Sequence, residues 1–351
     1  MRQSKFLQLF LLGLVLASYF SDTPARVVEH LTLARVPVAD RSDIEFARGT
    51  SKALELVLIK LTGNSRTPKT QQGRAVLAKA QRLVQQFGYE KSRTAGDSLL
   101  LRVEFDPQVL TEQMRASGLV LWGKERPETR LYVVVKNAGN ITTLSAQSPP
   151  SGTVEADIRE IILRQASNRG IPVSFPDLAS ATLVDVTNSP SAILDSVMAA
   201  EQSGADGVAV AVFDGSVGGL WEVRWLFQIA NDNEAFSNQG DLVALLAEEA
   251  TDSLADVIGR RYANPVLLGH KESVQLTVGG LYDAQDFARV ARYLKSLDSV
   301  ENLFIQRVID EKLIMSAVVQ GGYTGLEQSI AFGKVLTPVA DSPGEFRLIV
   351  R

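Results

Sequence analysis

The segment "SVQLTVGG" (Ser273–Gly280) is followed by "DAQDFARVARYLKSL" (Asp283–Leu297), and together they begin the most regular stretch of the chain. The first segment is typical of a strand and the second of an amphipathic helix. Two strands, a helix and a final strand follow, in "VENLFIQRVID", "KLIMSAVVQGG", "TGLEQSIAFGKVL" and "EFRLIVR". The order β-α-β-β-α-β predicts a ferredoxin-like module over residues 271–351.

Residues 128–262 also alternate strand-like and helix-like segments. A buried-type strand at Thr129–Val135 precedes helices at Val154–Gly170 and Ser189–Gly204. The segments "DGVAVAVFDG" and "LWEVRWLFQIA", joined through "SVGG", predict an antiparallel strand pair, and a helix at Gln239–Arg260 follows. This pattern predicts an open mixed sheet with helices packed against it.

Residues 26–127 predict an N-terminal α+β module. A strand is expected at Arg26–Val38, then a helix opened by a capping box of Ser42 and Glu45. The apolar stripe of that helix comprises Ala47, Leu54, Val57, Leu58 and Leu61. A second helix at Gln72–Phe87, strands at Tyr89–Ser92 and Ser98–Phe105, and a short helix after Asp106-Pro107 complete the module. The predicted fold class is α/β (α+β), with three small mixed-sheet modules.

The joint between the first two modules reads "GLVLWGKERPETR" (Gly118–Arg130) and combines an aromatic side chain with several charges. Trp122, Lys124 and Arg126 are therefore candidate interaction residues. Trp122 is either an anchor for a partner or a large side chain that seals the joint, and we favour the seal. Trp221 and Trp225 are further candidates; they share strand parity and so point to one face, which we expect to be core.

The N-terminus has the layout of a secretory signal peptide over residues 1–25. Arg2 and Lys5 precede the apolar run "FLQLFLLGLVLASYF", and small residues follow it. We expect cleavage after Ala25, with Ala17 and a retained leader as alternatives. The run is shorter than the roughly 20 residues of a spanning helix, so we expect a periplasmic protein without a membrane span in its mature chain.

The composition limits the possible chemistry. The chain has no cysteine and two histidines, His30 and His270, which removes most zinc and Cys/His sites. No catalytic, cofactor or metal constellation stands out, and "NDNEAFSNQGD" (Asn231–Asp241) lacks the order of a calcium loop, so we interpret it as a polar hairpin exit. The net charge of −4, without a basic cluster, argues against nucleic acid. An enzyme is the less favoured interpretation, and no cofactor is expected.

Several motifs carry a resemblance to a known family. "ALELVLIKLTGN", "VEFDPQVLTEQMRASGLVLWGKERP" and "DFARVARYLKSLDSV" resemble the bacterial family labelled Domain of Unknown Function 2066 across the mature chain. The resemblance implies an exported protein of Gram-negative bacteria and assigns no catalytic residue. The middle module, through "SGADGVAVAVFDG" and the strand after it, is similar in architecture to the N-terminal domain of the Tol-Pal translocation protein.

These observations favour a non-enzymatic adaptor that recognises other envelope proteins through exposed sheet edges or grooves between modules. The alternative is a cell-wall hydrolase or small-ligand-binding protein with its site at a module interface.

Overall fold

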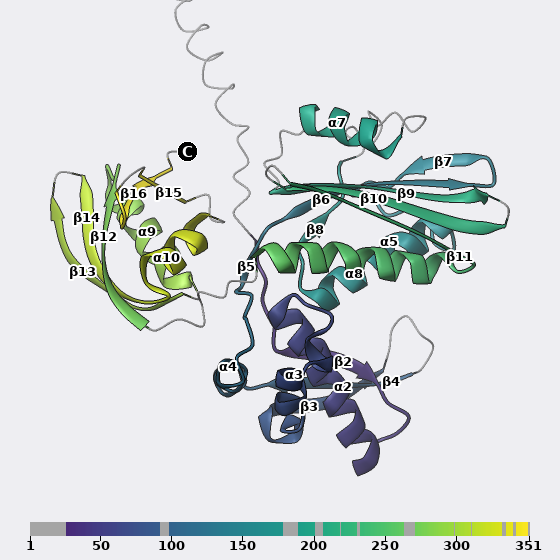
Figure 1. The fold of residues 1–351 in the computed structure, drawn as a ribbon, viewed down its shortest axis with the longest axis horizontal. Coiled ribbons are helices and arrows are strands. Elements are labelled where there is room, and N and C mark those ends of the chain that lie inside the picture. The colour runs from purple at the N-terminus through teal and green to yellow at the C-terminus, as the bar shows by residue number, and fades with distance from the viewer. Residues whose placement is uncertain are drawn as a thin grey trace, which may run out of the picture.

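The computed structural model describes residues 26–91, 98–177, 189–200, 206–217, 219–229, 232–262, 271–297, 299–309, 311–331, 335–339 and 342–349. The predicted leader with Ala25, and His270, lie outside the described residues. The chain is a mixed α/β protein with several small sheets (Figure 1). Over the described residues its buried apolar side chains form four core clusters, two of them on opposite faces of the middle sheet.

The first module packs helix α2 against a three-stranded sheet of order β2-β4-β3. Leu54, Val57, Leu58 and Leu61 of α2 are buried, which confirms that part of the predicted stripe. The capping box is half formed: Ser42 Oγ accepts from Glu45 N, but Ser42 N donates to Asp40 instead of Glu45. The elements are β1 Arg26–Val27, β2 Leu33–Pro37, α2 Asp43–Thr62, η1 Thr67–Lys69, α3 Gln71–Leu77, η2 Ala80–Leu83, β3 Val84–Lys91, β4 Leu99–Phe105 and α4 Pro107–Ala116.

Two predictions for this module are wrong. The single strand expected at Arg26–Val38 is broken at His30, whose φ of 57° turns the chain between β1 and β2. The helix expected at Gln72–Phe87 ends at Leu77, and its second half is a 3-10 turn followed by β3. Residues 84–91 pair with β4 along their length, so sheet hydrogen bonds outweigh a local helical pattern.

The middle module is the predicted open mixed sheet, of order β11-β10-β9-β6-β7 with β8 beside β6. Helices α5 and α8 cover one face and α7 lies on the other (Figure 1). The segment expected to be a polar hairpin exit is strand β11, which pairs with β10 along nine residues. The short strand β5 Glu125–Arg126 precedes this module and pairs with β1 of the first. The elements of the module are β6 Thr129–Asn137, β7 Asn140–Thr143, α5 Val154–Arg169, β8 Val173–Ser174, α7 Pro190–Ala200, β9 Gly207–Val217, β10 Leu220–Ile229, β11 Asp232–Gly240 and α8 Val243–Tyr262.

The C-terminal module has the predicted ferredoxin-like order with one strand added. Its sheet runs β13-β14-β12-β16-β15, and β16 lies parallel to β12 because the short strand β15 first turns the chain back. Val290 and Leu294 of α9 are buried in this core. The elements are β12 Lys271–Gly279, α9 Ala284–Ser296, β13 Val300–Ile309, β14 Lys312–Gln320, α10 Gly322–Ala331, β15 Leu336–Pro338 and β16 Glu345–Leu348.

Among the helices that the structure describes, none is long and apolar enough to cross a membrane.

Candidate functional site

The first two modules meet where the C-terminal ends of α2 and α5 converge on the fully buried side chain of Arg126. The last carbonyl groups of a helix have no partner within the helix and carry partial negative charge. Arg126 Nη2 donates to Lys60 O at 2.7 Å, and Nη1 donates to Gly170 O at 2.8 Å. One guanidinium therefore satisfies backbone carbonyls from both modules.

Trp122 completes this junction from the connecting segment. Its indole is buried, with the guanidinium carbon of Arg126 4.1 Å from the ring centroid. Its backbone N–H donates to Leu61 O at 2.7 Å, near the end of α2. Trp122 lies where a seal between modules would lie, and in this conformation its ring is enclosed by protein.

A second buried arginine joins the modules from α5. Arg169 donates to Asp252 Oδ1 at 2.7 Å, to Asp256 and to the carbonyl of Gly63. Asp256 also accepts from Ser65 N and Ser65 Oγ, at 2.9 and 2.6 Å. Burial by itself would raise the pKa of Asp256, but the Ser65 hydrogen bonds and the Arg169 charge outweigh it and hold that pKa below its ordinary value. Asp256 thus stays ionised as a partner for both modules.

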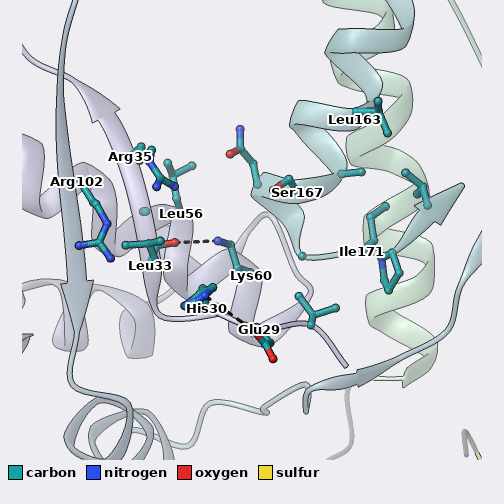
Figure 2. Close-up of a pocket in the computed structure, with 17 residues that line it drawn as sticks. Glu29, His30, Leu33, Arg35, Leu56, Lys60, Arg102, Leu163, Ser167 and Ile171 are labelled. Carbon is teal, nitrogen blue, oxygen red and sulfur yellow. Dashed lines mark hydrogen bonds and ion pairs between the residues drawn. The ribbon is translucent and has the colours of Figure 1, made fainter. Parts of the chain in front are cut away.

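A cleft of about 580 Å³ lies beside this junction (Figure 2). One wall comes from β2, β4 and α2 of the first module, and the other comes from the end of α5 and the segment after it. The apolar lining includes Leu33, Leu56, Leu163, Ile171 and Val173. Its volume falls within the roughly 300–1,000 Å³ of small-ligand pockets.

Lys60 supplies a partly buried ammonium to the cleft from the last turn of α2. Its Nζ donates to Leu33 O at 2.9 Å, and no carboxylate among the described residues forms an ion pair with it (Figure 2). Burial, together with the charges of Arg126 and Arg35, lowers the pKa of Lys60 to about 8. The cleft therefore holds an ammonium that no carboxylate of the described residues pairs with, a situation that favours an anionic guest.

Two guanidinium groups add positive charge at the same wall. Arg35 and Arg102 are paired opposite each other in the register of β2 and β4, and their side chains lie next to each other in Figure 2. Each also contacts a carboxylate, Glu90 at 2.9 Å and Glu104 at 3.0 Å. Because these ion pairs are partly exposed, each contributes little stability and leaves donors available to a ligand.

The remaining titratable groups of the lining are Glu29 and His30, at the exposed turn between β1 and β2. An amine with a lowered pKa can also act as a nucleophile toward carbonyl compounds. Among the described residues, no three His, Cys, Asp or Glu side chains lie close enough together to hold a metal ion. The arrangement is best suited to binding a negatively charged group against apolar walls.

The residues singled out from the sequence lie partly at this site. Trp122 and Arg126 form the junction behind the cleft, and Lys124 is exposed near it. Trp225 is buried and Trp221 partly buried in the core of the middle module, on the face expected. Sequence reasoning missed Lys60, Arg35 and Arg102. The one available signal was Lys60, a lone charge within the apolar run "LVLIKL".

Lys60 makes stability depend on pH. Its pKa in the folded protein lies below that of an unfolded lysine, so between about pH 8 and 10 the unfolded state binds more protons and stability rises with pH. Relative to Lys60→Met, the wild type should gain on the order of 2 kcal/mol over this range, measured by urea denaturation. The control is Lys52→Met on the same helix, where the lysine is exposed. Identical pH profiles for wild type and Lys60→Met would contradict the burial of this ammonium.

Comparison with known proteins gives a family match for the first module. No curated protein matches the chain. The matching family is neither family 2066 nor the Tol-Pal domain, so the comparison supports the expected resemblance only at the level of an uncharacterised domain. The matched region is the first module, which contributes Lys60, Arg35 and Arg102 to the cleft. Residues 25–123 are similar to a domain of unknown function, DUF8605.

Proposed function

We propose that this protein is a non-enzymatic adaptor of the cell envelope, whose cleft binds an acidic segment of another envelope protein. The observation that carries the proposal is the ammonium of Lys60, which lies between apolar walls without a carboxylate partner among the described residues. Arg35 and Arg102 extend the positive charge along the same wall. A carboxylate that enters the cleft gains charge-assisted hydrogen bonds from these groups.

The edge of β2, which borders the cleft, favours a protein segment as the ligand. β2 is the terminal strand of its sheet, and Thr32 O and Val38 N bond to β4. Because hydrogen-bonding direction alternates along an antiparallel strand, the N–H and C=O of Arg35 face away from β4. Arg35 thus offers one backbone donor and one acceptor to an extended chain, in addition to its guanidinium.

A second candidate function is the binding of a small anionic molecule in the same cleft. Its volume matches such a ligand, and a carboxylate or phosphate on an apolar body would satisfy the same three cations. The two candidates share the chemistry of the bound anion and differ in its source.

Location is part of the proposal. The apolar leader with small residues before Arg26 supports export to the periplasm. N-terminal sequencing of the mature protein tests the leader: a start at Arg26 supports cleavage after Ala25, whereas a start at Met1 contradicts it.

Binding of acetylated hexaglutamate, labelled with fluorescein, tests the acidic-segment proposal. At pH 7 and low ionic strength, the charge reversal of both cleft arginines (Arg35→Glu with Arg102→Glu) should weaken binding by roughly tenfold or more, because it replaces attraction to the peptide with repulsion. Tenfold corresponds to about 1.4 kcal/mol. Arg82→Glu, an exposed arginine of the same module outside the cleft lining, is the matched control. Binding should also weaken as pH rises through about 8, when Lys60 loses its proton.

Citrate and inorganic phosphate, added as competitors, identify the source of the anion. Displacement of hexaglutamate only at high concentrations of either supports a protein segment. Tighter binding of citrate or phosphate than of the peptide supports the small-ligand candidate. If Lys60→Met binds hexaglutamate, citrate and phosphate no more weakly than the wild type does, the cleft is not an anion site and both candidates fail.

A further inference from the structure

Strand β13 of the C-terminal module forms one edge of its sheet (Figure 1). Four large apolar side chains on it are exposed within six positions: Phe304 at 58%, Ile305 at 59%, Val308 at 53% and Ile309 at 44%. Most of the strand's other residues are also exposed. An edge strand with this much exposed apolar surface is a template for pairing with another strand.

Natural edge strands are usually protected by charges, proline or short length. β13 has ten residues and no proline, and its charged residues are Glu301 and Arg307. Glu301 contacts Lys271 Nζ at 2.6 Å, with both side chains about half exposed. Such a surface ion pair contributes little and can be exchanged for another partner. The charges on β13 therefore provide little protection.

We propose that β13 pairs in antiparallel fashion with β13 of a second copy of this chain, about a two-fold axis at Phe304. In this register Phe304 lies opposite Phe304 of the second copy, and Leu303 lies opposite Ile305. Glu301 lies opposite Arg307, and by symmetry this charge pair occurs twice. Moving the axis to the next residue on either side separates the opposite charges, so charge complementarity selects this register.

The local structure of β13 sets the expected strength of the dimer. Bulges interrupt its pairing with β14 between Val300 and Asn302 and between Ile305 and Arg307. A regular run at Asn302–Ile305 remains, and this run contains the apolar centre of the proposed interface. A contact of this length lies at the low end of specific interface sizes, so a dissociation constant in the roughly micromolar range is expected. The surface is separate from the cleft, and the inference does not rest on the proposed function.

Sedimentation velocity of the purified full chain over a wide concentration range tests the pairing. Wild type should shift from monomer to dimer, and Phe304→Lys should remain monomeric. Glu301→Arg and Arg307→Glu should each weaken the dimer by roughly tenfold, because each places like charges opposite each other twice. The combined variant, Glu301→Arg with Arg307→Glu, restores opposite charges across the interface and should recover most of the affinity.

Two controls separate the interface from general surface effects. Lys271→Ala removes the existing ion pair of Glu301 and should leave dimerisation nearly unchanged. Ile44→Lys adds the same charge at an exposed apolar residue of α2 and should also have no effect. A wild-type chain that is monomeric at all concentrations, or a dimer unaffected by Phe304→Lys, overturns the proposal. A combined variant as weak as the single variants overturns the register.

Discussion

Replacing Arg126 with methionine should destabilise the joined first and middle modules by about 3–5 kcal/mol. The fully buried guanidinium donates to Lys60 O, Gly170 O, Arg169 O, Trp122 O and Gly123 O. Methionine fills much of the volume but donates no hydrogen bond, so helix-end carbonyls of both modules lose their partner. Urea denaturation followed by tryptophan fluorescence measures the loss, since Trp122 lies against Arg126.

The same substitution should act on the cleft. The charge of Arg126 contributes to the lowered pKa of Lys60, so Arg126→Met should move that pKa back toward its ordinary value. Arg126→Lys is the informative companion: it retains the charge but not the planar fork, so an intermediate loss of stability is expected. Arg82→Met, at an exposed arginine, should change stability by less than about 0.5 kcal/mol. An Arg126→Met protein as stable as wild type would show that the two modules do not depend on this junction.

The elements with strong periodicity could be predicted from the sequence. Most of the stripe of α2, the ferredoxin-like order and the hairpin of β9 and β10 follow from local patterns and were confirmed. Residues 84–87 were assigned to a helix, whereas they begin strand β3, which forms by pairing with β4. Strand β11 was missed because it is an exposed edge strand with mostly polar side chains, so its sequence lacks the apolar alternation of a half-buried strand.

The cleft could not be predicted for a related reason. Lys60, Arg35 and Arg102 come from α2, β2 and β4, and strand register alone places the two arginines opposite each other. The opposite wall comes from α5 of the next module. The unusual composition of the joint drew attention to Trp122, with a seal as the favoured role, and to Arg126, but it did not indicate that the Arg126 side chain bonds to helix ends of both modules. Those bonds depend on three-dimensional contacts between segments distant in sequence.

The backbones of the first two modules approach each other closely at Gly63, which follows α2, and Gly259 in α8. A Cβ atom on Gly259 would lie 2.2 Å from Gly63 O and 2.7 Å from Gly63 Cα. Gly63 has a φ of 67°, and its own Cβ would lie 2.7 Å from the ring of Trp122. These neighbours are backbone atoms and a buried ring, which cannot move aside as a flexible side chain can.

Gly259→Ala should therefore destabilise the joined modules by about 3 kcal/mol. In an isolated helix the same change stabilises by roughly 0.5–1 kcal/mol, because alanine has the higher helix propensity. The sign of the effect thus tests the junction itself. Urea denaturation measures the free energy of unfolding of Gly259→Ala. The control is Gly88→Ala, because nothing lies within 4 Å of a carbon added at Gly88. If Gly259→Ala instead stabilises the protein by roughly 0.5–1 kcal/mol, α8 and the end of α2 are apart in solution. The two modules would then be separated, and the cleft would lose the wall that α5 provides.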